Sequence, residues 1–236
     1  MLRSSKFKGM TEYIKEAFSL LLSRDSELLQ IITVTLQMSF FSTLISSLLG
    51  LPFGTMLGRA EFRGKGLIIR ITNTLMGLPP VVAGLIVFLI LSHSGPLGSL
   101  SLLFSITAMV IAQVVLITPL IAGMSAASSS IRAPRFRETA CGLKMGKGKE
   151  IALLMIECKA QFVSIILLGF GRAIAEVGAV SLVGGNIQFK TRVMTTAIML
   201  ETNKGNFRFA VALGIVLLTI SFFVNSIAYT AGEKIK

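Results

Sequence analysis

The chain has 236 residues, of which 53% are apolar, and its 23 basic and 11 acidic side chains make up only 14% of the sequence. Soluble domains carry about a quarter charged residues, so this composition argues against a water-soluble enzyme. The net charge of +12 does not indicate nucleic-acid binding. In proteins that bind nucleic acid, basic residues gather on one soluble face. Here the Lys and Arg residues instead flank apolar segments.

Long segments without any Asp, Glu, Lys or Arg dominate the chain, at 28–58, 71–131 and 209–232. A membrane-spanning helix needs roughly 20 consecutive apolar residues. The first and last segments therefore each fit one span, and the middle segment fits two with a turn between them. We expect an all-α polytopic membrane protein with about five transmembrane helices, placed at 29–57, 67–91, 102–124, 161–183 and 208–230.

The parts outside the spans divide the chain further. Apolar residues between Met10 and Leu21 recur at helical spacing, with charged residues on the other face, which is typical of a helix lying at a membrane surface. We therefore expect a tail and interfacial helix over 1–28, a transmembrane domain over 29–230 and a short tail over 231–236.

The distribution of basic residues predicts how the spans are oriented. The 59–70 and 125–160 loops together contain eleven Lys and Arg residues, whereas 92–101 and 184–208 contain four. Basic loops tend to remain in the cytoplasm, so the first pair of loops is expected to face inward. The C-terminus is then cytoplasmic and the N-terminus outside, although five basic residues in the N-terminal tail weigh against this orientation.

The 125–160 loop has a regular pattern of its own. Three serines and a basic run precede Glu138-Thr139-Ala140, which is followed by a glycine-rich turn and an apolar helix from Ile151 to Ile156. The pattern predicts two short helices around a turn, with both apolar and basic faces. Two interpretations remain open: a basic loop held against anionic lipid headgroups, or a docking element for a soluble cytoplasmic protein.

Charged residues and prolines also occur within the predicted spans. Arg172 and Glu176 are the only charges in the fourth span, and their spacing places them on one face of a continuous helix. A charge in a membrane is costly, so such residues typically mark a pathway or gate, with a purely structural ion pair as the alternative. Pro79 and Pro80 are expected to kink or break the second span, either for packing or as part of a gate.

The sequence contains no recognisable catalytic or metal site. The run Gly146-Lys147-Gly148-Lys149 lacks the spacing and the hydroxyl residue of a nucleotide-binding loop. His93 is the single histidine, and Cys141 and Cys158 have no histidine near them, which makes a poor zinc site. We expect a protein that is not an enzyme and that binds no metal or cofactor of its own.

Glu138-Thr139-Ala140 and the residues after it resemble the coupling loop of ATP-binding-cassette (ABC) importer permeases, where Glu-Ala-Ala is followed after three residues by Gly. Lys144 stands at that glycine position. Because Lys is poorly suited to a left-handed backbone, Gly142 or Gly146 is expected to supply the left-handed residue of the turn.

Further blocks extend the resemblance over about residues 10–230. They run from Asn73 to Leu85, from Gly169 to Val180, from Val183 to Asn186 and from Thr191 to Thr202. Together these blocks resemble tungstate-importer permeases. The block around Arg172 is shared in looser form by molybdate and sulfate permeases.

The resemblance implies a type I ABC permease fold in the plasma membrane of a bacterium or archaeon. It implies import of an oxyanion, with tungstate expected and with molybdate, sulfate or another anion as the alternative. An ATP-independent transporter or channel is the less favoured reading. The implied partners are a separate ATPase that binds the ATP, an extracytoplasmic oxyanion-binding protein and a second copy of this chain.

The expected functional residues form two groups, of which the coupling loop rests on the resemblance. The expected pathway or gate comprises Arg172, Glu176, Pro79 and Pro80. The expected ATPase coupling loop comprises Glu138, Thr139, Ala140, Gly142, Lys144 and Gly146.

Overall fold

The computed structural model describes Lys15, Ser19 and residues 25–234. Within these residues every regular element is a helix and none is a strand, which confirms the expected all-α class. The predicted interfacial helix of the N-terminal tail lies outside the described residues, apart from Lys15 and Ser19.

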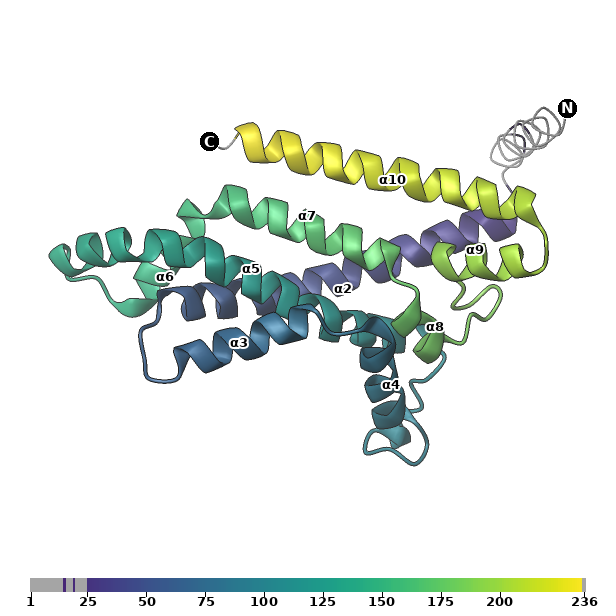
Figure 1. Ribbon diagram of the computed structural model, residues 1–236, viewed down its shortest axis with the longest axis horizontal. Coiled ribbons are helices and arrows are strands. Elements are labelled where there is room, and N and C mark those ends of the chain that lie inside the picture. Colours follow the sequence, from purple (N-terminus) through teal and green to yellow (C-terminus); the bar gives the residue numbers. More distant parts are fainter. Residues whose placement is uncertain (1–14, 16–18, 20–24, 235–236) are drawn as a thin grey trace, which may run out of the picture.

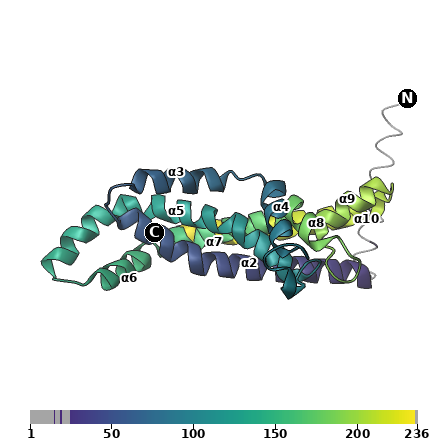
Figure 2. The ribbon, with the colours of Figure 1, turned by 90° about the horizontal axis from the view of Figure 1, so that it is seen from below.

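Five helices run along the long axis of the molecule: α2 (Ser26–Arg59), α3 (Lys65–Met76), α5 (Ile106–Gly142), α7 (Lys159–Ala175) and α10 (Phe207–Lys234) (Figure 1). α5 lies at the centre of the packing, because it contacts α2, α3 and α7, and α10 packs against α7. Figure 2 shows α2 and α3 on opposite sides of α5. α10 continues through most of the expected C-terminal tail.

Shorter elements cover the ends and one side: α4 (Pro80–Leu91), η1 (Gly98–Leu100), α6 (Lys147–Glu157), α8 (Gly178–Gly184) and α9 (Met194–Asn203). α4 turns away from the long helices and packs against α8 (Figure 1). α6 lies at the end where α10 finishes, and α9 lies at the opposite end, where α2 begins.

The helices are long and apolar enough for a polytopic membrane protein. In the described part of the chain α2, α5 and α10 could each cross a membrane, and the number rises to five if each of two bent pairs is one span. These pairs are α3 with α4, bent by 96°, and α6 with α7, bent by 71°. The expected number of about five spans therefore agrees with the upper count from the structure, and the bend at Cys158 divides α6, in the 125–160 loop, from α7, in the fourth predicted span.

Small residues bring α2 and α5 close together. Gly50, Gly54 and Gly58 recur every four residues on α2. A Cβ atom added at Gly50 would lie 2.9 Å from Ile121 Cγ2, and one at Gly58 would lie 2.5 Å from the Ala126 carbonyl oxygen. Without side chains at these positions the two backbones approach closely, which is the usual way membrane helices gain van der Waals contact.

The prediction that the 125–160 loop begins with a separate short helix is wrong. α5 continues from the third span through Pro119 and Pro134 to Gly142, without a break. Ala126 and Ala133 remain buried beyond the end of the predicted span at residue 124. Continued packing keeps the helix intact past the apolar segment, so only α6 is a separate helix of the loop.

The fourth predicted span, 161–183, is also not one helix. α7 ends before Glu176, which has an extended backbone, and α8 begins two residues later. Two side chains bind carbonyl oxygens at the break: Gln113 Nε2 donates to Ala173 O at 2.8 Å, and Thr195 Oγ1 donates to Glu176 O at 2.8 Å. An interrupted helix is tolerated within a membrane where protein groups satisfy the backbone in this way.

Candidate translocation pathway and coupling loop

Arg172 and Glu176 do not form the pair that their spacing predicts. Glu176 lies beyond the end of α7, with φ −73° and ψ 133°, so the two residues are not on one helical face. Glu176 is buried, and its Oε1 accepts a hydrogen bond from the Ala179 N–H at 3.2 Å, at the start of α8. None of the ion pairs within residues 25–234 includes Arg172.

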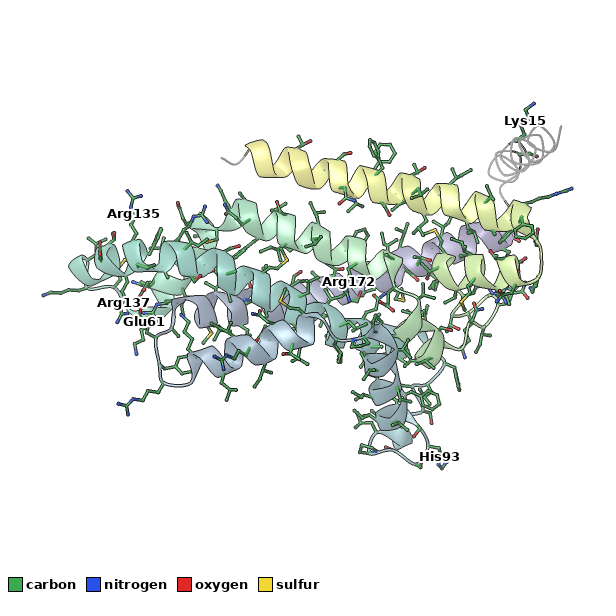
Figure 3. The ribbon with its side chains drawn as sticks, viewed as in Figure 1. Lys15, Glu61, His93, Arg135, Arg137 and Arg172 are labelled. Carbon is green, nitrogen blue, oxygen red and sulfur yellow. The ribbon has the colours of Figure 1, made fainter. Side chains whose placement is uncertain are left out.

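Arg172 instead borders a cavity of about 420 Å³ between α5, α7 and α10. Leu120 from α5 and the polar residues Ser221 and Asn225 from α10 contribute to its lining. The Arg172 Nε atom is buried and, among the described residues, has no hydrogen-bond partner. Figure 3 places Arg172 near the middle of the long axis. A guanidinium with unused donors beside hydroxyl and amide groups can hold an anion transiently.

Pro79 and Pro80 break the second span, as expected. α3 ends at Met76, and Pro80 occupies the first position of α4, where its missing N–H costs no helical hydrogen bond. This break lies against the break in α7, because a Cβ atom at Gly178 would be 2.9 Å from Val81 Cγ2. The structure therefore brings Pro79, Pro80 and the Glu176 region together, while Arg172 faces a separate cavity.

The expected coupling residues lie at the tip of a helical hairpin. Glu138, Thr139 and Ala140 are in the last turns of α5, which ends at Gly142. Ala140 is buried, whereas Glu138 and Thr139 are exposed. Figure 2 shows the hairpin of α5 and α6 extending beyond the end of α2. Two exposed polar residues at this tip suit a docking surface for another protein.

Lys144 itself adopts the left-handed backbone of the hairpin turn, with φ 50°. The Met145 N–H donates to the Ala140 carbonyl at 2.9 Å, which is the six-to-one hydrogen bond of a Schellman cap. The expectation that Gly142 or Gly146 supplies the left-handed residue is wrong, because Gly142 is helical and Gly146 has φ −70°. The helix cap requires a left-handed residue at position 144, and the lysine there adopts that conformation although it is not a glycine.

Replacing Lys144 with Gly is expected to stabilise the hairpin turn slightly, and replacing it with Val is expected to destabilise it. A left-handed non-glycine residue costs roughly 1–2 kcal/mol, and glycine offsets part of that gain through its own entropy. Thermal unfolding of the purified protein in detergent would measure this, with the Gly variant melting at least about 2 °C above the Val variant. Equal melting temperatures would contradict a strained Lys144.

Polar contacts also order the two ends of α9, and one of them joins the residues just before α9 to the start of α2. Arg192 Nη1 donates to Glu27 Oε1 at 2.7 Å, and Arg192 is itself buried. Burial of Glu201 acts to raise its pKa, but hydrogen bonds from Lys204 and Asn206 outweigh it and leave the pKa below its usual value. These contacts order the end of the molecule opposite the hairpin.

Several residues that the sequence analysis did not select join distant elements. Gln113 connects α5 to α2 and α7, and Arg59 connects α2 to Glu150 of α6. Gln113 and Asn225 could have been noticed, because each is an amide within a charge-free apolar segment. For Arg59 and Glu150, 91 residues apart, the sequence carries no sign that they meet.

Residues 50–235, which include both candidate sites, match the family described as binding-protein-dependent transport system inner membrane components. The chain belongs to this family. The permease is 40% identical to the tungstate uptake system permease protein TupB of Peptoclostridium acidaminophilum, over 94% of this chain and 100% of that one. It is 35% identical to the TupB protein of Campylobacter jejuni, over 91% and 90%. It is 27% identical to the molybdenum transport system permease protein ModB of Azotobacter vinelandii, over 71% and 77%.

Proposed function

We propose that this permease imports tungstate as the membrane-spanning subunit of an ATP-driven importer. The full-length match at 40% identity to a permease named for tungstate uptake carries the proposal. The match to a permease named for molybdenum is weaker, at 27%. Molybdate, sulfate or another anion is therefore the alternative substrate.

A separate ATPase chain would dock on the hairpin of α5 and α6. The exposed Glu138 and Thr139, together with the exposed Lys147 and Lys149 at the start of α6, offer charged and polar groups beyond the spans. ATP would be bound and hydrolysed by that partner, and this chain would need no cofactor of its own. The hairpin end and the C-terminus would then be cytoplasmic, with the N-terminus outside.

An extracytoplasmic oxyanion-binding protein would deliver substrate at the opposite end, near α9. A second copy of the permease would complete the pathway. The apolar face of α4 supports this pairing, because Val81, Leu85 and Leu89 are about half exposed there. The breaks at Pro79, Pro80 and Glu176 would form the gate, since they pack against each other. Arg172 would offer the passing dianion a temporary counter-charge.

Deleting the gene is expected to lower intracellular tungsten selectively in cells grown with trace tungstate and molybdate. Elemental analysis would compare tungsten, molybdenum and sulfur in the deletion strain, the parent and a strain complemented with the intact chain. Restoration of tungsten by the intact chain, but not in a strain that lacks the partner ATPase, would support an ATP-driven importer.

Other results would change the proposal. Normal tungsten with depleted molybdenum or sulfur would replace the substrate and keep the transport class. Normal levels of all three elements, in a strain that produces the ATPase partner, would contradict oxyanion import.

A further inference from the structure

Arg59 and Glu150 form a buried ion pair at the end of the molecule that carries the hairpin. Arg59 is the last residue of α2, and its Nη2 donates to Oε2 of Glu150 in the first turn of α6. The two side chains are only 19% and 6% exposed. The nearby pair of Arg137 and Glu61, labelled in Figure 3, is 55% and 72% exposed, with 2.8 Å between Nη1 and Oε2. One pair is thus enclosed by protein, and its neighbour faces solvent.

The buried pair holds together through opposed effects on Glu150. The hydrogen bond from Arg59, its charge and the charge of Arg137 lower the pKa of Glu150 below its usual value, although burial acts in the opposite direction. Glu150 is therefore ionised at neutral pH. The stabilising effect of the pair is fully present above the ordinary glutamate pKa of 4.5, and it is lost as the pH falls from there through the lowered pKa of Glu150. Removing Arg59 takes from Glu150 the cation that donates its hydrogen bond, and breaking a buried pair by removing one partner is strongly destabilising, so the two side chains are strongly held together.

α6 is a separate short helix between two changes of chain direction. The left-handed turn at Lys144 separates it from α5, and a 71° bend at Cys158 separates it from α7. Leu154, in the second half of α6, is fully buried in the main core. The first half is joined to α2 through Glu150. A force applied to the hairpin tip would therefore reach α2 directly, and not only through α5 and α7.

α2 in turn is joined to the break in α7. Gln113 of α5 is fully buried, and its Oε1 accepts a hydrogen bond from Ser42 Oγ of α2 at 2.5 Å. Its Nε2 donates to Ala173 O at 2.8 Å, in the last turn of α7 before Glu176. The chain of contacts therefore runs from α6 through Arg59 and α2 to the break at Glu176.

We propose that Arg59 and Glu150 are positioning residues that carry the movement of α6 to α2 and so to the broken helix at Glu176. The inference rests on the proposed function, because it takes the hairpin as the ATPase docking element. It adds a link from the first turn of α6 to the end of α2.

The experiment measures tungstate uptake and ATP hydrolysis together, with the complete permease–ATPase complex in proteoliposomes and its binding protein present. The variants are Arg59→Glu, Glu150→Arg and the double exchange. The matched control reverses the charge of the exposed Arg63, which lies in the loop after α2 and takes part in none of the ion pairs of the described residues, with Arg63→Glu. The quantity compared is tungstate transported per ATP hydrolysed, because a purely structural fault would lower the amount of complex and leave this ratio unchanged.

Each single reversal at the buried pair is expected to lower the ratio at least about tenfold, and the double exchange to restore it to within about threefold, because contacting residues are energetically coupled. The Arg63→Glu control should change it by less than about twofold, because an exposed charge contributes little. Unchanged ratios in the single variants, or a double variant as defective as either single one, would overturn the inference.

A milder variant covers the case in which a reversal prevents assembly. Glu150→Gln keeps the shape of the side chain and still accepts a hydrogen bond from Arg59, but it removes the charge. A ratio lowered about threefold is expected from the loss of part of the coupling, and an unchanged ratio overturns the inference. Failure of the proposed function is read separately, because the wild-type complex would then show no ATP-dependent tungstate uptake.

Discussion

Replacing Arg172 with Ala is expected to lower tungstate uptake by at least about a hundredfold, because an uncompensated charge in a membrane costs about 3 kcal/mol or more. Arg172 borders the cavity between α5, α7 and α10, and none of the ion pairs of residues 25–234 includes it. Its buried Nε is an unused donor within the described part of the chain. A dianion passing this cavity would lose its one guanidinium partner there in the Ala variant.

Uptake by proteoliposomes containing the assembled complex is the appropriate measurement. Arg172→Lys should retain part of the activity, since it keeps the charge but not the planar set of donors. Lys159→Ala removes an exposed cation from the other end of the same helix and should have little effect. Normal uptake by assembled Arg172→Ala would remove Arg172 from the pathway and leave it a role in packing alone.

Replacing Gly54 with Leu is expected to prevent accumulation of folded permease. A Cβ atom at this position would overlap Ser125 Oγ and the Ala122 carbonyl oxygen, and it would lie 3.0 Å from the Ala122 carbonyl carbon. These neighbours are largely backbone, which cannot rotate away as a side chain could. Overpacking typically costs about 1–3 kcal/mol, and an obstacle made of backbone places this variant at or above that range.

The amount of monodisperse protein extracted from membranes by detergent would measure the effect. Gly214→Ala is the matched control, because it lies in α10, where an added Cβ atom meets nothing within 4 Å. That control should accumulate normally, since Ala is a better helix former than Gly. Normal yield and melting behaviour of Gly54→Leu would mean that α2 and α5 are not packed as closely as described.

The sequence was a good guide wherever a property depends on neighbouring residues. Charge-free segments located the spans, because each charged side chain placed in lipid carries its own free-energy cost, whatever the rest of the fold. Pro79 and Pro80 indicated the break in the second span, because proline removes a helical hydrogen bond wherever it occurs. The tip of the hairpin was likewise located by Glu138-Thr139-Ala140, although α5 proved longer than expected.

The sequence was a poor guide to the fourth span and to the hairpin turn. The stretch 161–183 is apolar enough to be one helix, and the four-residue spacing of its charges suggested a pair on one face. The break became possible because Gln113 and Thr195, which lie far from it in sequence, bind backbone oxygens on either side. At the turn, residue type favoured a glycine, but the helix cap placed Lys144 in the left-handed region.

By itself, then, the sequence determined an all-α membrane protein, the approximate positions of its spans and the family resemblance that led to a transport function. Only the tertiary structure decided which helices are interrupted, which cavity Arg172 faces and that Arg59 meets Glu150. The physical reason is the range of the interactions. Hydropathy and proline geometry act along a few residues of chain, whereas ion pairs, amide bridges and close glycine contacts depend on which distant helices lie side by side.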